Sequence, residues 1–164
     1  MSDQNNKRCA YICSALTELP QEVQEPFKFV LSRTADLCEE VLGVRGFAPH
    51  EHNDPVHAPS KTPKEVDAHE RPQVAEKTSV LIVFTNAPSW GGGIEVEIAN
   101  QNNVPVILLR EIINSKPRKV SRLLLGSPGV KEVVDYEMYN DLFDKLREVL
   151  PRVALPATAK KAFA

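Results

Sequence analysis

The residues best placed to do chemistry stand together in a glycine-rich segment, residues 88–95 (P-S-W-G-G-G-I-E). Glycines let a backbone come close to a ligand, and the start of a helix favours negative charge. We therefore expect the carboxylate of Glu95 to be ionised, and such a carboxylate can act as a nucleophile toward an electrophilic sugar carbon. The alternative roles are structural: Glu95 as a charge that complements the helix dipole, and Ser89 as the residue that caps the helix.

Three better-known uses of such a segment do not fit. Gly91 and Gly93 begin a G-x-G-x-x-G dinucleotide motif, but Val96 occupies the place of the third glycine. No Gly-Lys-Ser/Thr completes a phosphate-binding P-loop, and no G-x-S-x-G indicates a serine hydrolase. Glu97 points to another face of the expected helix, so we expect it to be solvated.

The segment lies inside a pattern that predicts a βαβ unit. An apolar run at residues 80–84 predicts a buried strand before it, residues 93–102 predict a helix, and the run 104–109 predicts a second strand. In such a unit ligands usually bind beyond the carboxyl ends of the strands.

The remaining elements alternate in the same way. Strands are predicted at residues 9–15, at 47–48 as a short second strand, and at 130–134. Three further helical segments are expected. The first is a long amphipathic helix ending at Gly43, and the second is capped by Thr62, has Pro63 in its first turn and is bent or divided into two short helices at Pro72. The third is a short basic helix from Pro117 to a stop at Gly126. A last helix, residues 138–150, should stop at Pro151.

Residues 49–63 contain four prolines and three histidines, His50, His52 and His57, without periodicity. This composition predicts an irregular loop that covers or lines a pocket. No C-x-x-C or H-E-x-x-H spacing accompanies the histidines, so a metal site is the weaker interpretation.

Together these elements predict an α/β fold, flavodoxin- or Rossmann-like and doubly wound, with a mostly parallel five-stranded sheet in the order 2-1-3-4-5. The switch point between the first and third strands then brings Ser14 close to residues 88–95. Residues 9–150 would form one domain, preceded by a disordered N-terminus (1–8) and followed by a C-terminal tail (151–164) that frays.

Composition narrows the class of protein. The 164 residues carry a net charge of −2, so no basic field indicates nucleic acid or an anionic membrane as a partner. No apolar run reaches the length of a membrane span, and residues 1–8 lack the apolar core of a signal peptide. Cys9, Cys13 and Cys38 are an odd number without a C-x-x-C pair, which favours buried thiols in a reducing cytoplasm.

The segment P-S-W-G-G-G-I-E-V-E-I-A, followed by V-P-V-I-L-L, resembles the nucleoside 2-deoxyribosyltransferase superfamily. The resemblance is strongest to the branch that hydrolyses the N-glycosidic bond of nucleoside 5′-monophosphates. It covers most of residues 9–150, and its specificity is concentrated in residues 88–99. The strand that ends in Asp135-Tyr136 and the helix after it are also similar to the family.

The resemblance implies roles for particular residues. Glu95 would be the catalytic nucleophile, Ser89 would contact the 5′-phosphate, and Ser121, five residues before Gly126, would complete the phosphate site from a neighbouring subunit. Trp90 could stack on the base or cover the edge of the sheet. The further residues implied in the substrate pocket are Tyr11, Cys13, Ser14, Ala15, Gly91 and Gly93.

The sequence departs from the family in two places. The family carries an aspartate before the third strand that helps to hold the ribose and to protonate the base; here Glu70 or Asp67 would replace it. The loop at residues 49–63 also differs from the short connection of many relatives and would reshape base recognition.

The resemblance implies an enzyme that needs no metal or other cofactor and that acts on a small nucleoside or nucleotide as a homodimer or higher homo-oligomer. Its reaction would be hydrolysis of a nucleoside 5′-monophosphate. The alternatives are base exchange as a deoxyribosyltransferase and a nucleotide-sensing module with little turnover, since Glu70 stands where the family has aspartate.

Overall fold

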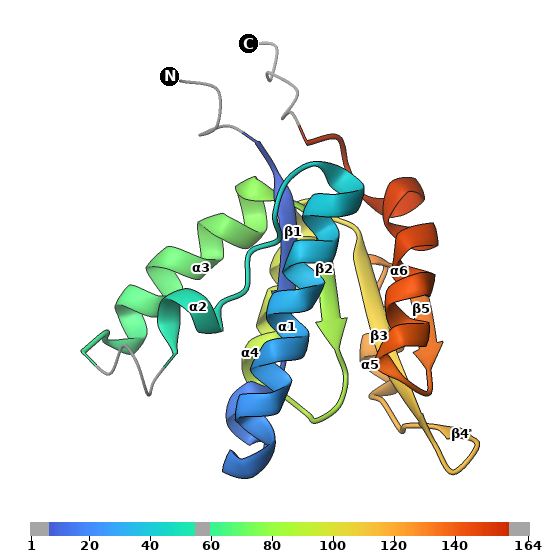
Figure 1. Ribbon diagram of the computed structural model, residues 1–164. Coiled ribbons are helices and arrows are strands. Elements are labelled where there is room, and N and C mark those ends of the chain that lie inside the picture. Colours follow the sequence, from blue (N-terminus) through green and yellow to red (C-terminus); the bar gives the residue numbers. More distant parts are fainter. Residues whose placement is uncertain (1–6, 55–59, 158–164) are drawn as a thin grey trace.

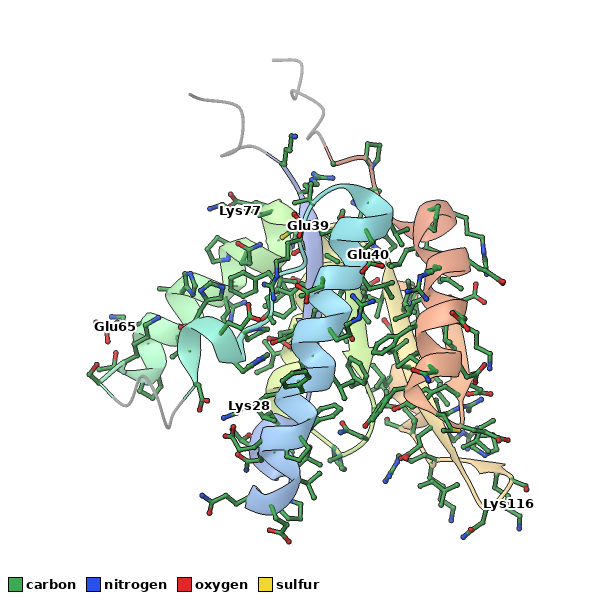
Figure 2. All side chains as sticks on the ribbon, in the orientation of Figure 1. Lys28, Glu39, Glu40, Glu65, Lys77 and Lys116 are labelled. Atoms are coloured by element: carbon green, nitrogen blue, oxygen red, sulfur yellow. The ribbon has the colours of Figure 1, made fainter. Side chains whose placement is uncertain are left out.

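A five-stranded sheet forms the centre of the computed structural model, which describes residues 7–54 and 60–157 (Figure 1). The strands are β1 (Cys9–Cys13), β2 (Thr78–Phe84), β3 (Val106–Ile113), β4 (Lys116–Pro117) and β5 (Val130–Tyr136). The strands β1, β2, β3 and β5 are parallel and lie in that order. The two-residue β4 pairs antiparallel with the end of β3, and Figure 2 shows Lys116 at the tip of this hairpin.

Helices cover both faces of the sheet. They are η2 (Leu16–Glu18), α1 (Gln21–Leu42), α2 (His50–Asn53), α3 (Pro63–Lys77), α4 (Trp90–Gln101), α5 (Arg122–Leu125) and α6 (Tyr139–Val153). Figure 1 shows α1 and α6 side by side on one face, and α3 and α4 on the other. The predicted doubly wound α/β architecture is therefore confirmed.

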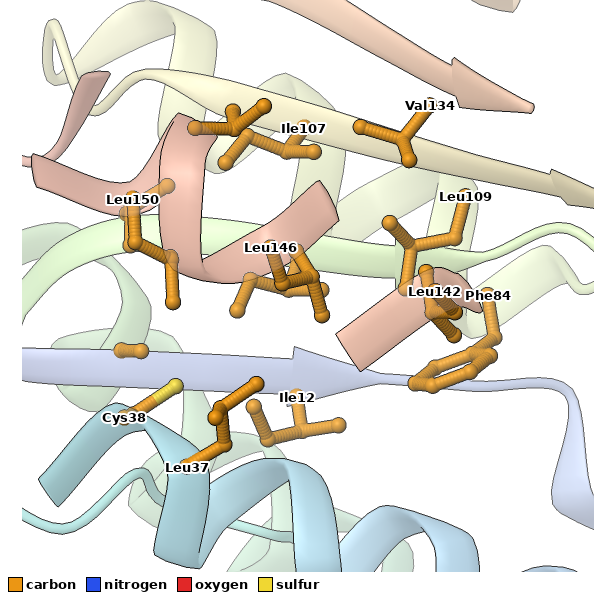
Figure 3. Packing of buried hydrophobic residues seen from close by; sticks show 14 of the residues in the cluster. Ile12, Leu37, Cys38, Phe84, Ile107, Leu109, Val134, Leu142, Leu146 and Leu150 are labelled. Carbon is orange, nitrogen blue, oxygen red and sulfur yellow. The ribbon is translucent and has the colours of Figure 1, made fainter. Parts of the chain in front are cut away.

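Alternation along the strands decides which side chains meet which helices. Ala10 and Ile12 of β1 face the core under α1 and α6, where Figure 3 shows Ile12 beside Leu37 of α1. Tyr11 and Cys13 face the opposite core, which contains residues of α3 and α4. This one-residue alternation places the side chains of Tyr11 and Cys13 on the face that carries Glu95.

The strand order agrees with the prediction in part: β1, β2, β3 and β5 lie in the predicted order, but the fifth strand of the sheet is the antiparallel β4. Residues 47–48 do not form a strand. Instead, Phe47 makes an isolated parallel bridge to Tyr11, at the outer edge of β1. Two backbone hydrogen bonds hold it there, from the Phe47 amide to the Ala10 carbonyl (2.7 Å) and from the Ile12 amide to the Phe47 carbonyl (2.8 Å).

The region expected to be an irregular loop contains a helical turn, α2, so that part of the prediction was wrong. Each residue of α2 and the following Asp54 has a side-chain contact with a neighbouring element, and this long-range packing leaves no periodic signal in the sequence. His57 lies outside the described residues.

Two proline predictions were also wrong. The helix α3 continues through Pro72, and α6 continues through Pro151 to Val153. Each proline removes one helical donor, but packing of the buried Val74 after Pro72, and of Val149 and Leu150 before Pro151, keeps these helices on the sheet. The division into two short helices expected at Pro72 and the stop expected at Pro151 are therefore absent from these two helices.

Two further helices begin elsewhere than expected, while one boundary was predicted well. The helix α4 begins at Trp90 instead of Gly93, and α5 is a single turn because Lys116–Pro117 belong to β4. The helix α1 ends before Gly43 as predicted, where φ is +75° and the Gly43 amide bonds to the Glu39 carbonyl.

The start of the expected C-terminal tail is attached to the sheet. The Leu155 amide donates to the Ser79 carbonyl (2.8 Å), and the Arg8 amide donates to the Ala157 carbonyl (2.6 Å). In the part of the chain that the structure describes, no helix is long and apolar enough to cross a bilayer.

Candidate active site

The three glycines of the 88–95 segment lie inside the first turn of α4. Ser89 caps the helix: its backbone is extended (φ −142°) and its Oγ accepts the Gly92 amide at 3.1 Å. The Gly93 amide makes the first intrahelical bond, to the Ser89 carbonyl. None of the three glycines has a positive φ, so they are not there to form a left-handed turn.

Gly92 is required by the close approach of α4 to β1. A Cβ at this position would lie 3.1 Å from the Sγ of Cys13, whereas a Cβ on Gly93 would meet no atom within 4 Å. The missing side chain at Gly92 therefore lets the helix start pack against the end of β1, one turn before Glu95.

Glu95 is partly buried and bonded to β1. The Oη of Tyr11 donates to its Oε1 at 2.5 Å, and the Cys13 thiol also hydrogen-bonds to the carboxylate. Tyr11 and Cys13 are two residues apart on a strand, so both side chains lie on the face that α4 covers.

Burial dominates the electrostatics of this group. Burial raises the pKa of Glu95 to about 7; hydrogen bonds from Cys13 and Tyr11 act in the opposite direction, and the charge of Glu70 raises the pKa further. Burial also raises the pKa of the Tyr11 hydroxyl and of the Cys13 thiol, so both remain protonated donors at neutral pH.

The structure separates the two residues that could replace the family aspartate. Asp67 is exposed on α3 and pairs with Arg71, Oδ1 to Nη2 at 2.8 Å. Glu70, one turn later, is partly buried, accepts a hydrogen bond from Asn53 (2.9 Å) and acts by its charge on Glu95, Tyr11 and Cys13. Only Glu70 of the two therefore belongs to the cluster around Glu95.

A cleft of about 910 Å³ opens at the carboxyl ends of β1 and β2, at the predicted switch point. The sequence-predicted residues that line it are Cys13, Ser14, Ala15, Ser89, Trp90, Gly93 and Ser121. Gly91 does not line the cleft. Glu95, Tyr11 and Glu70 form a cluster beside it, and Cys13, which contacts Glu95, also lines the cleft wall together with Gly92.

Several lining residues were not expected from the sequence. Arg118 and Lys119 bring positive charge to the same wall as Ser121, and Arg118 also pairs with Glu111 at 2.8 Å. The Oδ1 of Asn86 is buried at the cleft and has no hydrogen-bond partner among the described residues. The adjacent basic residues Arg118 and Lys119 could have indicated part of a binding site from the sequence. No pattern in the sequence indicated Asn86.

The histidines and cysteines were the candidates for metal binding in the sequence. His52 stacks on Phe47 with ring centroids 4.5 Å apart, and Phe47 stacks on Tyr11 at 5.3 Å. Within residues 7–54 and 60–157, no three His, Cys, Asp or Glu side chains come together as a metal site. Cys9, Cys13 and Cys38 are free thiols, and Cys13 and Cys38 are buried.

Fold and site define an α/β protein with a half-buried carboxylate beside a cleft at the switch point of a parallel sheet. No protein-family model and no curated protein sequence matches the chain. Solved structures show what the fold is similar to, and the likeness supports the resemblance to the nucleoside 2-deoxyribosyltransferase-like fold.

Three of the similar structures illustrate the likeness. The CMP N-glycosidase BcmB of Clostridium botulinum is 19% identical with a TM-score of 0.58, over 83% of this chain and 97% of its own. A 2-deoxyribosyltransferase of Bacillus psychrosaccharolyticus is 16% identical with a TM-score of 0.53, over 82% and 90%. BlsM is 19% identical with a TM-score of 0.58, over 90% and 94%. At these identities the comparison establishes the fold alone.

Proposed function

We propose that the protein hydrolyses the N-glycosidic bond of a nucleoside 5′-monophosphate, with Glu95 as the nucleophile. The observation that carries the proposal is the Glu95 carboxylate, held between Tyr11 Oη and the Cys13 thiol beside the cleft. A structural helix-end charge would gain from exposure to water, whereas this carboxylate is partly buried and its pKa is raised to about 7. The fold shared with a CMP N-glycosidase supports the same reaction class.

The reaction would proceed in two displacements. The ionised Glu95 attacks the anomeric carbon, the bond from that carbon to the base nitrogen breaks, and a ribosyl-enzyme ester forms. Glu70, directly or through water, assists the proton transfer that releases a neutral base. Water then attacks the anomeric carbon, Glu70 takes up a proton from it directly or through a second water, the bond from that carbon to Glu95 breaks, and the sugar phosphate leaves. The Tyr11 and Cys13 donors stabilise the carboxylate whenever it is negative.

Phosphate recognition would use the start of α4. The Ser89 Oγ already accepts the Gly92 amide, so its hydroxyl proton remains available to donate to a phosphate oxygen. The first amides of a helix have no intrahelical acceptor, so those of Trp90 and Gly91 are further donors at the positive end of the helix. Arg118 and Lys119 add positive charge along the same cleft.

We further propose that the protein acts as a cytoplasmic homodimer, with Ser121 of one copy completing the phosphate site of the other. Ser121 lines the cleft, and Trp90 and Leu123 near it expose 91% and 87% of their surface. Large exposed apolar side chains beside a polar site are typical of a surface that another chain covers. The three free thiols are compatible with a reducing compartment.

The test is release of free base from a panel of nucleosides and nucleoside 5′-monophosphates, followed by chromatography. We expect monophosphates to react and Glu95→Ala to abolish the reaction, while Glu76→Ala, an exposed glutamate on α3, leaves it intact. Tight nucleotide binding with no base release, unchanged by Glu95→Ala, would instead establish a sensing module and contradict the proposal.

A second candidate, base exchange, is favoured by the fold shared with a 2-deoxyribosyltransferase. Both reactions pass through the same kind of ester, between Glu95 and the anomeric carbon of the sugar, and differ in the acceptor. Faster turnover of unphosphorylated deoxyribonucleosides in the presence of a free acceptor base, with formation of a new nucleoside, would decide for the transferase.

A further inference from the structure

The helical turn α2 is fastened to α1. Asp54, just after α2, pairs with Lys28 of α1 at 2.7 Å, and both side chains are almost fully buried. Glu51 accepts two hydrogen bonds from Arg45, at 2.7 and 2.8 Å, and one from Ser32 of α1 at 2.8 Å. Figure 2 shows Lys28 on the side of α1 toward α2 and α3. Asn53 therefore projects from a backbone that has little freedom to move.

The side-chain amide of Asn53 is oriented by a charge on each end. Its Oδ1 accepts from Lys61 Nζ at 2.6 Å, and its Nδ2 donates to Glu70 Oε1 at 2.9 Å. Lys61 also donates to the His52 carbonyl, which ties it to α2. Rotating the amide by half a turn would place its oxygen against the Glu70 carboxylate and its NH₂ against an ammonium group, so the observed orientation is the favourable one.

Glu70 needs such a partner to stay near Glu95. It is a partly exposed glutamate with three side-chain torsions, and a like charge across the site repels it when Glu95 is ionised. An unrestrained side chain of this kind gains both entropy and hydration by turning toward solvent. One turn earlier on α3, Asp67 does turn outward, to Arg71.

We propose that Asn53 is a positioning residue, which holds the Glu70 carboxylate beside Glu95 and so fixes the group that serves the departing base. The inference rests on the proposed function for its catalytic consequence, but the placement of Glu70 by Asn53 can be measured without turnover. It also explains what the unusual 49–63 region contributes, because α2 carries the residue that holds the proton-transfer group.

The kinetic test is a double-mutant cycle between Asn53 and Glu70. Asn53→Ala should lower kcat on the order of tenfold, the effect of about 1.4 kcal/mol at the transition state, with little change in KM. In a Glu70→Gln background the same substitution should have no further effect, because the residue it positions is already inactive. Additive losses in the double variant would overturn the proposal.

Two other substitutions sharpen the cycle. Asn53→Asp, nearly identical in shape, should reduce kcat more than Asn53→Ala because it places a negative charge against Glu70. Lys61→Met, which frees the Asn53 amide, should give a smaller loss, and Lys64→Met, an exposed lysine in the first turn of α3, is the matched control and should give none. Equal behaviour of the two lysine variants would contradict the role given to Lys61.

A readout independent of activity follows the Glu95 carboxylate by NMR in protein with labelled glutamate. The groups that face Glu95 are Tyr11 and Cys13 from β1 and Glu70 from α3. Because Glu70 raises the Glu95 titration midpoint, Asn53→Ala should lower that midpoint in the same direction as Glu70→Gln. If Glu70→Gln lowers it and Asn53→Ala does not, Asn53 does not position Glu70, whether or not the enzyme turns over. Melting curves of each variant verify that it folds.

Discussion

The surroundings of Glu95 have two opposite effects on its pKa. Burial favours its neutral form, while the Tyr11 hydroxyl and the Cys13 thiol favour its charge; burial prevails, and the pKa rises to about 7. A nucleophile with this pKa is ionised in about half of the molecules at neutral pH, and its negative charge is less stabilised by water than that of an exposed glutamate. A poised carboxylate of this kind suits attack on a sugar carbon.

The raised pKa predicts how activity depends on pH. Since only the ionised Glu95 can attack, kcat/KM should fall as the pH decreases through about 7 and should level off above it. The measurement is the rate of base release as a function of substrate concentration, between pH 5 and pH 9 in buffers of constant ionic strength. A plateau that extends unchanged to pH 5 would contradict the assignment of Glu95 as the nucleophile.

The same shift predicts an effect on stability that needs no substrate. The folded-state pKa of Glu95 is above that of an unfolded glutamate, so its ionisation weakens the fold as the pH rises through about 7. Glu95→Gln should therefore raise the melting temperature at pH 8, by at most the roughly 6–12 °C that about 3 kcal/mol represents. The gain should shrink at pH 5, where Glu95 is protonated in the folded protein. An equal change in melting temperature at both pH values would show that burial does not govern this group.

At the scale of elements, the packing of α4 on β1 decides whether the site exists. The first turn of α4 carries three glycines, which is a poor composition for a helix, because each costs about 1 kcal/mol relative to alanine. Of the three, Gly92 has a neighbour that explains why glycine is needed there despite this cost, because a Cβ would lie 3.1 Å from the Cys13 Sγ. Gly93 has open space around it on the cleft side.

These two glycines form a matched pair for measurement. Gly93→Ala should stabilise the folded protein by roughly 0.5–1 kcal/mol through helix propensity. Gly92→Ala should lose that gain and destabilise by about 1–3 kcal/mol because it overpacks the contact with Cys13. Denaturant unfolding of both variants measures the difference, and Cys13→Ala should restore most of the stability of Gly92→Ala. The absence of that rescue would place the clash elsewhere.

Elements with local signals were predicted well, and those that depend on distant partners were not. The apolar runs behind β2, β3 and β5 and the helix ending at Gly43 carry periodicity that depends only on neighbouring residues. The turn α2 is held by pairs such as Lys28–Asp54 and Arg45–Glu51, whose contribution cannot be read from local composition. Likewise Pro72 is tolerated because of what α3 packs on, which a residue-by-residue reading of proline misses.

The predictions for the site also divide into those with a local signal in the sequence and those that depend on distant partners. Glu95 and Ser89 could be proposed from the sequence because the residues around them resemble a family pattern, and the predicted topology brought Ser14 to the cleft that Ser89 also lines. The choice of Glu70 over Asp67 could not be made, since the two differ by one helical turn and only the position of α2 separates them. Asn53 was not expected at all, because its partners are in two other segments.

At the scale of the whole molecule, the face around the cleft is unusually apolar for one exposed to water. Trp90, Leu123 and Ile94 are exposed by 91%, 87% and 54%. If a second copy covers this face, Leu123→Glu should convert the protein from a dimer to a monomer, as measured by sedimentation equilibrium, without lowering the melting temperature of the monomer. An unchanged sedimentation profile would exclude this face from the interface.

Mixing experiments test whether Ser121 acts across the interface. Glu95→Gln and Ser121→Ala should each be inactive or weak alone. In a mixed dimer, one site would combine the intact Glu95 of one copy with the intact Ser121 of the other, so mixing should restore part of the activity. If Ser121 serves the cleft of its own chain, no combination restores a site and the mixture stays as weak as its components.

The isolated β-bridge at Phe47 has a consequence for the aggregation of the protein. A strand at the edge of a sheet exposes backbone groups that can pair with another chain and begin aggregation. Phe47 binds the Ala10 carbonyl and the Ile12 amide on the outer side of β1, and its ring lies between those of Tyr11 and His52. One residue thereby closes the middle of an edge that is five residues long. Replacing Phe47 with proline, which has no amide to donate, would reopen that edge and should appear first as aggregation during refolding.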